Sequence, residues 1–378
     1  MKNKAGGQGE NDEWLREKMK GEQSMNRRSV RWLLPVVVVL VLASSVFSET
    51  ETAGSKPEIT VVLTGDIYLG SWLEPTLLKD PTYPYSGVRE ILNQGDLVLG
   101  NLETPLSRRG EVYIEKTYTF RCDPEVVHTL KAGGFDAVSL ANNHIMDFGP
   151  EALADTTAIL QEHGIKYAGA GEDLARAREP ALLERKGLKI AFLAYNNTFP
   201  LEFNATAARA GTARGQWEYI REDVKKAAAL ADLVIVSFHW SGEGVKTPRD
   251  YQRQFGKLCI DSGAHLVFGH HPHVPQGLEV YKHGLIAYSL GNFVFASYST
   301  RVRESLLLKV KMDRSGLRAA YIYPININNH QVNFRPQLFR GEEAEEVLRE
   351  IQKLSAAFRT RIKIEEDLGM IELPRNRN

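Results

Sequence analysis

The chain has 378 residues, of which 43% are apolar and 25% charged, and its 47 basic residues balance its 47 acidic ones. A chain of this length and composition builds an ample core, either as one large globular domain or as two ordinary ones. The zero net charge and the lack of a long basic run interleaved with aromatic residues exclude the usual nucleic-acid-binding classes. We therefore expect no nucleic-acid partner.

The amino-terminal residues predict a targeting segment rather than a part of the fold. Residues 1–24 are polar and charged, which is typical of a disordered leader. Residues 25–48 combine an arginine-rich flank, an apolar run and small residues, which is the layout of a signal peptide cut after Ser48. The stretch 32–47 falls only slightly short of a membrane-spanning helix, so an uncleaved anchor is the alternative. Either way we expect export, to the extracellular face of the cell membrane or to the cell wall, and Met25 is an alternative start of the chain.

From residue 58 onward, short β-branched or apolar runs alternate with amphipathic helical stretches. Strands are predicted at 58–66, 96–103, 135–144, 188–197, 232–240, 264–271 and 284–295. Helices are predicted at 123–132, 150–163, 217–230 and 249–262. This alternation favours an α/β layered fold for the main domain, residues 58–300. Within residues 301–378, a hairpin turning at 313–316 and a helix over 341–358 are expected to complete the same domain.

Side chains that can bind metals follow the predicted strands at their carboxyl ends. Ligands of open α/β sheets sit at that edge, and five strand ends with metal-competent side chains are hard to obtain by chance. We therefore predict a metal site there. Its candidate ligands are Asp66, Glu103, Asn143, His239, His270, His271 and His273.

The donor set indicates which ions and which reaction the site serves. Carboxylate and amide oxygens with imidazole nitrogens suit manganese, iron or zinc, and a carboxylate can bridge two ions. Two ions about 3.5–4 Å apart clamp the attacking and leaving oxygens of a phosphoryl transfer, with metal-activated water as the nucleophile. Asp66 and His144 are the predicted catalytic residues, with His144 as the proton donor to the leaving group. Glu243 is either a substrate-binding or a solvated acid, and Asn292 lies in a tight loop expected to border the substrate.

Seven segments resemble, in chain order, the signatures of the CapA family of capsule synthesis proteins. They are GDIYLG, NLETPLS, FRCDPEVVHTLKAGGFDAVSLANNHIMDFG, YAGAGEDLARAREP, SFHWSGEG, GHHPHVPQGLEVY and YSLGNFVF. The resemblance covers about residues 58–296 and implies the calcineurin-like metallophosphoesterase superfamily, with a four-layered α/β/β/α sandwich around a metal centre. It implies that Asp66 is the first-strand aspartate and Glu103 the bridging carboxylate. It also implies that Asn143 and His144 form the Asn-His pair, and that His239 and the 270–273 cluster supply the late histidine ligands.

The sequence departs from the wider superfamily at three motifs. Asp66-Ile67-Tyr68 stands where the superfamily has Asp-x-His, so one histidine ligand is missing. Glu103 stands where the superfamily has the aspartate of a Gly-Asp motif. The Gly-His-x-His motif has one extra residue, which leaves His270 and His271 as alternatives beside His273. A single-ion centre is therefore an alternative to a two-ion centre.

The resemblance implies an exported, metal-dependent phosphoesterase-like protein that acts in the biosynthesis of capsule, poly-γ-glutamate or a related cell-surface polymer. The expected partners are a phosphorylated or polyanionic surface polymer and a membrane-bound polymer synthase. The alternative is a non-catalytic capsule-assembly or polymer-binding factor that retains the fold, and the missing histidine favours it. A serine hydrolase is set aside because the sequence has no Gly-x-Ser-x-Gly elbow.

Overall fold

The computed structural model describes residues 57–373. The predicted leader (1–24) and the predicted signal peptide or anchor (25–48) lie outside these described residues. Among residues 57–373, no helix combines the length and the apolar character that crossing a membrane requires.

The first sheet has ten strands and supplies one side of the site. Its strands are β1 (Glu58–Tyr68), β2 (Leu97–Leu102), β3 (Ala137–Ser139), β4 (Lys166–Ala168), β13 (Asn292–Phe295), β14 (Glu304–Asp313), β15 (Gly316–Asn326), β16 (Gln337–Leu338), β17 (Ile362–Glu365) and β18 (Leu368–Ile371). The order is β17-β18-β15-β14-β1-β2-β3-β4, and β13 pairs with β1 and β16 with β15. β1 to β4 and β13 are parallel, whereas β14 joins β1 antiparallel.

The second sheet has six strands and supplies the other side of the site. Its strands are β6 (Ala181–Arg185), β7 (Leu188–Asn196), β9 (Leu233–His239), β10 (Leu266–His270), β11 (Leu278–Tyr281) and β12 (Gly284–Ala287). They follow the order β11-β12-β10-β9-β7-β6, with the four central strands parallel. A small separate pair is formed by β5 (Ala170–Gly171) and β8 (Gly211–Thr212).

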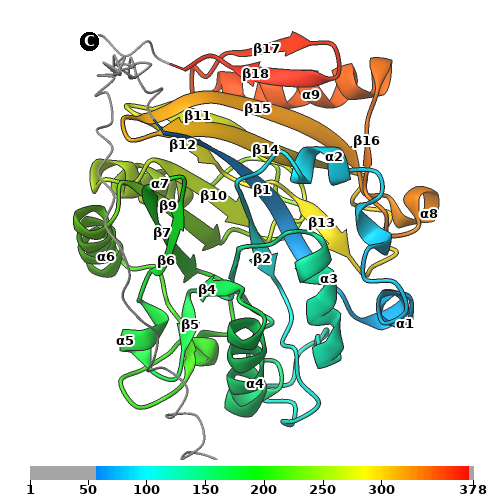
Figure 1. The fold of residues 1–378 in the computed structure, drawn as a ribbon, viewed down its shortest axis with the longest axis vertical. Helices are drawn as coiled ribbons and strands as arrows, with labels where there is room; N and C mark the ends of the chain where they lie inside the picture. The colour runs from blue at the N-terminus through cyan, green and yellow to red at the C-terminus, as the bar shows by residue number, and fades with distance from the viewer. Residues whose placement is uncertain (1–56, 374–378) are drawn as a thin grey trace, which may run out of the picture. The chain divides into compact units, whose positions relative to one another are not determined.

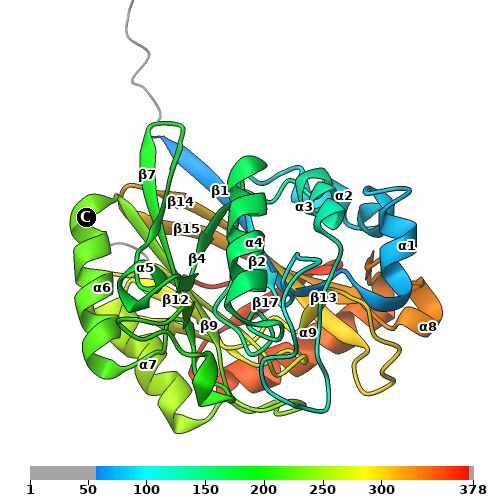
Figure 2. The ribbon, with the colours of Figure 1, turned by 90° about the horizontal axis from the view of Figure 1, so that it is seen from below.

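Three apolar cores hold the layers together. The helices are α1 (Glu74–Leu77), α2 (Arg89–Leu92), α3 (Val127–Ala132), α4 (Gly149–Glu162), α5 (Leu174–Ala177), α6 (Trp217–Leu230), α7 (Asp250–Asp261), α8 (Asn329–Val332) and α9 (Gly341–Ala356). Leu63 of the first sheet and Phe268 of the second belong to the core between the two sheets. A second core packs α3 and α4 on the first sheet, and a third packs α6 and α7 on the second. Figures 1 and 2 show α6 and α7 on one side of the strands and α1 and α3 on the other. The predicted four-layered α/β/β/α sandwich is therefore confirmed.

Helix α4 shows how closely local sequence sets an element. It begins at Gly149 with Pro150 in its first turn, where the missing N–H costs nothing. It ends just before Gly164, whose φ of +71° suits a residue without a Cβ. The predicted helix over 150–163 is confirmed to within one residue at each end.

The predicted strand over 284–295 is wrong. The structure divides it into β12 and β13, and β12 belongs to the second sheet whereas β13 pairs with β1 in the first. The break falls at Gly291, whose φ of +81° turns the chain. The N–H of Gly291 donates to Ser289 Oγ, which stabilises the turn. This segment therefore crosses from one sheet to the other beside the site.

Candidate metal centre

The candidate site lies where the carboxyl ends of the two sheets meet. The first sheet brings Asp66 in β1, Glu103 after β2 and the pair Asn143–His144 after β3. The second sheet brings His239 at the end of β9 and the turn 270–273 that starts at the end of β10. The sequence predicts one common sheet edge, and the structure instead brings two stacked edges together.

Asp66 is the most connected member of the site. It is fully buried and accepts hydrogen bonds from Asn101 Nδ2 at 2.9 Å and from the backbone N–H of His271 at 3.2 Å. His270 Nδ1 lies 3.1 Å from Oδ1, and His273 Nδ1 lies 3.3 Å from Oδ2. Burial alone would raise the pKa of Asp66, but the two imidazoles hold that pKa well below its usual range. Asp66 is therefore an ionised carboxylate that is engaged at both oxygens.

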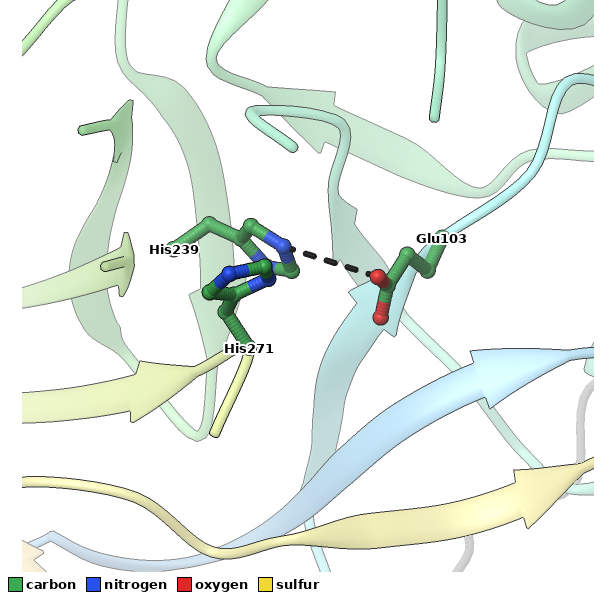
Figure 3. A group of neighbouring side chains, drawn as sticks. All are labelled: Glu103, His239 and His271. Carbon is green, nitrogen blue, oxygen red and sulfur yellow. Dashed lines mark ion pairs between the residues drawn. The ribbon is translucent and has the colours of Figure 1, made fainter. Parts of the chain in front are cut away.

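Glu103 is the opposite case, a buried carboxylate without donors. It is fully buried, and neither oxygen has a hydrogen-bond partner among the described residues. Figure 3 shows its carboxylate facing the rings of His239 and His271, with His239 Nε2 3.5 Å from Oε1. Burial, and after it the charge of Asp66, raises the pKa of Glu103 well above its usual range. Because such a group is costly to bury, its oxygens mark a place that a cation fits.

The turn 270–273 has an uncommon backbone conformation, which sets the directions of its imidazole rings. His271 and His273 have φ values of +88° and +58°, a left-handed region that residues other than glycine adopt uncommonly. Burial, with the charge of His273, lowers the pKa of His271 to about 3. That ring is neutral at pH 7, and a neutral imidazole is the form that binds metals. Neither His271 Nδ1 nor His270 Nε2 has a hydrogen-bond partner within residues 57–373.

His273 is held from behind by Asn292. Its Nδ1 lies 2.7 Å from Asn292 Oδ1, and its Nε2 lies 4.0 Å from Glu103 Oε1. Burial lowers the pKa of His273, but Glu103 and Asp66 outweigh burial and raise that pKa to about 10. An imidazole ligand commonly donates its second N–H to such an oxygen, which fixes the ring. Asn292, predicted to bind substrate, thus also contacts a candidate ligand.

Asn143 and His144 face the cluster from the loop after β3. Asn143 Oδ1 lies 2.7 Å from His239 Nε2. His144 Nε2 lies 4.0 Å from Glu103 Oε1, whereas its Nδ1 lies 2.7 Å from Asp147 Oδ2. An ionised carboxylate only accepts hydrogen bonds, so Nδ1 carries the proton and Nε2 is directed toward the cluster. Burial lowers the pKa of His144, and Asp147 opposes that shift.

Asp147 and Lys116 lie behind this pair and were not among the predicted site residues. Acids commonly cap helices, but the N-cap of α4 is Phe148 and no side chain caps there. Asp147 instead contacts His144 and Lys116. Its position three residues after His144 is a usable signal, whereas nothing in the sequence marks Lys116.

Glu243 stands apart from the other predicted site residues. It is exposed, in the loop after β9, and no ion pair of its side chain occurs within residues 57–373. The loop is tied to the histidine turn, because the N–H of Gly244 donates to the carbonyl of Pro272 at 2.9 Å. The charge of Glu243 also helps to raise the pKa of Glu103, which places it near the cluster but outside it.

The assembled residues fit a divalent cation. Two groups each bring three ligand atoms within 4.8 Å of one another: Glu103, His239 and His271, and Asp66, Glu103 and His273. Glu103 belongs to both groups, as a bridging carboxylate would. The unpartnered oxygens of Glu103 and the unpartnered Nδ1 of His271 supply the lone pairs that a cation would take up.

Comparison with known proteins gives the family. Residues 60–297 match the family described as bacterial capsule synthesis protein PGA_cap. The chain is 30% identical over 322 residues to the capsule biosynthesis protein CapA of Bacillus anthracis, covering 82% of this chain and 78% of that protein. It is also 30% identical over 341 residues to the PGA biosynthesis protein CapA of Bacillus subtilis, covering 88% and 89%.

Among solved structures, the NAD nucleotidase of Haemophilus influenzae superimposes with a TM-score of 0.42 at 12% identity. The superposition covers 79% of this chain and 63% of that chain, which is less than two thirds of its length. This similarity is too weak to assign the fold, so the fold is assigned from the sheet topology of the chain itself. The family match and the two CapA relatives agree with the predicted motifs, and the chain belongs to the PGA_cap family of bacterial capsule synthesis proteins.

Proposed function

We propose that this chain is an exported, metal-dependent phosphoesterase that acts in the biosynthesis of capsule, poly-γ-glutamate or a related surface polymer. Family membership and the names of the two CapA relatives support the polymer context. The observation that carries the chemistry is the fully buried Glu103, which two groups of candidate ligands share. A phosphorylated or polyanionic polymer is the proposed substrate class, and a membrane-bound synthase the proposed partner.

The proposed centre would hold manganese, iron or zinc, as one or two ions. Asp66 and His273 would hold one ion and His239 with His271 the other, with Glu103 between them. Bound there, the metal would activate water and neutralise charge on a phosphate ester. His270 Nδ1 lies 3.1 Å from Asp66 Oδ1. His270 would therefore orient Asp66 and would not itself bind the metal.

His144 has the geometry of a proton donor to a leaving group. Its Nδ1–H is directed to Asp147, so the second nitrogen is the one that faces the cluster. Protonation of Nε2 would form an imidazolium that Asp147 stabilises, and His144 would transfer that Nε2 proton to the leaving group. Asp66 would fix the turn that carries the histidines, through the N–H of His271 at 3.2 Å.

A non-catalytic polymer-binding or assembly factor is the second candidate, and Tyr68 favours it. Tyr68 stands where the superfamily motif has a histidine, and it is 8% exposed. Its ring stacks on Phe120 with the ring centroids 4.0 Å apart. A phenol in such a stack is a poor substitute for an imidazole ligand, so the centre has one potential ligand fewer.

The test combines elemental analysis of the purified full-length chain with a screen of phosphomonoesters and phosphodiesters. We expect at least one equivalent of a transition metal and turnover that Asp66→Ala abolishes. Asp261→Asn is the matched control, because Asp261 is an exposed acid on α7 that pairs with Lys282. Less than about half an equivalent of metal after reconstitution would remove the metal centre. Metal without turnover would favour the assembly factor.

Export has its own measurement. We propose that the mature protein lies on the extracellular face, anchored or secreted. Cell fractionation with mass spectrometry of the amino terminus distinguishes the two forms, because cleavage after Ser48 leaves Glu49 as the first residue. Recovery of the intact chain in the cytosol alone would contradict export.

A further inference from the structure

A loop without helix or strand, residues 107–122, reaches over the candidate site. We call it the site loop. Its ends are closed by a hydrogen bond from the N–H of Ser107 to the carbonyl of Cys122 at 3.0 Å. From its middle, Lys116 is directed inward, so that its side chain is only 18% exposed. Because a lysine is rarely this buried without a partner, its contacts indicate its role.

The ammonium of Lys116 contacts the residues that hold the Asn143–His144 pair. Its Nζ lies 2.6 Å from Asp147 Oδ1 and 3.1 Å from His144 Nδ1. It also donates to the backbone carbonyl of Asn143. The other oxygen of Asp147 accepts from His144 Nδ1 and from the N–H of Phe120, another residue of the site loop.

The ammonium of Lys116 is therefore directed toward acceptors of the protein itself. Two acceptors, one carboxylate oxygen and one carbonyl, lie in contact with the ammonium, and His144 Nδ1 occupies the space beside them. The geometry leaves the ammonium facing Asp147 and Asn143 rather than an incoming anion. Lys116 is for this reason not placed to bind substrate.

Aromatic packing fixes the same ring from its face. The ring of Phe120 stacks on His144 with centroids 3.8 Å apart and planes 16° apart. Tyr68 stacks on the other face of Phe120 at 4.0 Å and 13°. The residue that replaces the superfamily's histidine thus supports a stack that ends at His144. The stack restrains the plane of the ring, and the Asp147–Lys116 pair restrains its rotation within that plane.

We propose that Lys116 is a positioning residue, which holds Asn143 and His144 in the orientation that the site needs by bridging Asp147 and the Asn143 carbonyl. Only the expected fall in kcat rests on the proposed function; the orientation of His144 does not. A buried ion pair adds little to stability on average. Because the Lys116–Asp147 pair lies against His144, a role in orientation is favoured. Removal of a group that orients a ligand or its neighbour costs about 10–100-fold in activity or metal affinity.

The test compares Lys116→Met, Lys116→Gln and Lys116→Arg in the full-length, metal-loaded protein at one fixed pH. The matched control is Lys186→Met, because Lys186 forms a similar pair with Asp96 at 2.7 Å but is 57% exposed and lies in the turn between β6 and β7. Two readouts are collected, the ring ¹⁵N signals of His144 and the separate kcat and KM of ester hydrolysis. Circular dichroism reports whether each variant folds.

In the wild type, Lys116→Arg and Lys186→Met, we expect one set of His144 signals with the proton on Nδ1. In Lys116→Met and Lys116→Gln, we expect a second ring orientation or tautomer and a fall in kcat of about 10–100-fold, with KM changed less than threefold. Unchanged ring signals in a folded Lys116→Met or Lys116→Gln protein would overturn the proposal. So would a rise in KM at constant kcat, since that pattern belongs to substrate binding. If the wild type hydrolyses no ester, the proposed function fails, and the ring signals alone still decide the role of Lys116.

Discussion

Replacing Glu103 by glutamine should have opposite effects on stability with and without metal. Glu103 is fully buried, and its oxygens have no hydrogen-bond partner among the described residues. Without metal, the carboxylate therefore destabilises the folded protein, and Glu103→Gln removes the charge while keeping the shape. With metal, the same carboxylate belongs to both ligand groups, so its loss removes the shared ligand.

The two effects have similar size and opposite sign. Leaving a buried polar group unpaired costs about 1–3 kcal/mol, which the variant partly recovers in the metal-free protein. A metal present at about 100 times its dissociation constant stabilises the wild type by about 2.7 kcal/mol. The variant should lose most of that gain. The order of stability should therefore reverse when metal is added.

The pH dependence supplies an independent check of the sign. The pKa of Glu103 is raised in the folded protein, so the folded state binds a proton more tightly than the unfolded state does. Stability of the metal-free wild type should therefore decrease as the pH rises above the unfolded value of 4.5. The difference between Glu103→Gln and the wild type should widen over the same range.

The assay is thermal unfolding of the full-length chain by circular dichroism, in chelator and with added Mn²⁺ or Zn²⁺. Glu184→Gln is the control, because Glu184 is an exposed glutamate on β6, outside the cluster. An unfolding temperature of Glu103→Gln that is lower than that of the wild type in chelator would refute the reasoning. So would an equal response of the two proteins to metal.

Three further predictions concern residues around the cluster. A Cβ on Gly65 would lie 1.9 Å from the carbonyl oxygen of Gly291, so Gly65→Ala should lower the free energy of unfolding by about 1–3 kcal/mol and reduce the metal content, measured by calorimetry and elemental analysis. Asn292→Ala removes the acceptor of the His273 ring, and titration calorimetry should show metal affinity about 10–100-fold lower. Burial lowers the pKa of His265 from 6.5 to about 4, so the unfolded state binds its proton first as the pH falls. Protonation of His265 should therefore lower the free energy of unfolding by at most about 3 kcal/mol between pH 6.5 and 4. In denaturant titrations, His265→Gln should not show this part of the pH dependence.

Much of the fold follows from periodic patterns in the sequence. The runs at 58–66, 188–197 and 232–240 become β1, β7 and β9 because each is apolar, bounded and long enough to be a buried strand. The pattern does not say which sheet a strand joins. The run 284–295 shows this limit, because its two halves pair with different sheets. Pairing depends on contacts between distant segments, which periodicity does not contain.

The candidate site was predictable where its residues end strands. Asp66, His239 and His270 lie within the last residues of their strands, and the structure brings them into one cluster. Lys116 lies in a loop with no periodic pattern, and its role depends on how that loop folds back on the site. Local sequence favours an acid such as Asp147 as a helix cap, but three-dimensional contacts with His144 and Lys116 decide its role.

The candidate ligands come from both sheets, which has a consequence for the stability of the whole sandwich. Glu103 follows a strand of the first sheet, whereas His239 and the 270–273 turn belong to the second. The chain itself joins the two edges at the same place, where the N–H of Asp66 donates to the carbonyl of Gly291 at 3.0 Å. A cation held by Glu103 and His239 would therefore cross-link the layers as well as order the loops. The same contacts explain why space is so limited at Gly65, since any displacement of β1 from β13 moves Asp66 away from the histidines. The geometry of the candidate site and the packing of the two sheets are thus set by one group of residues.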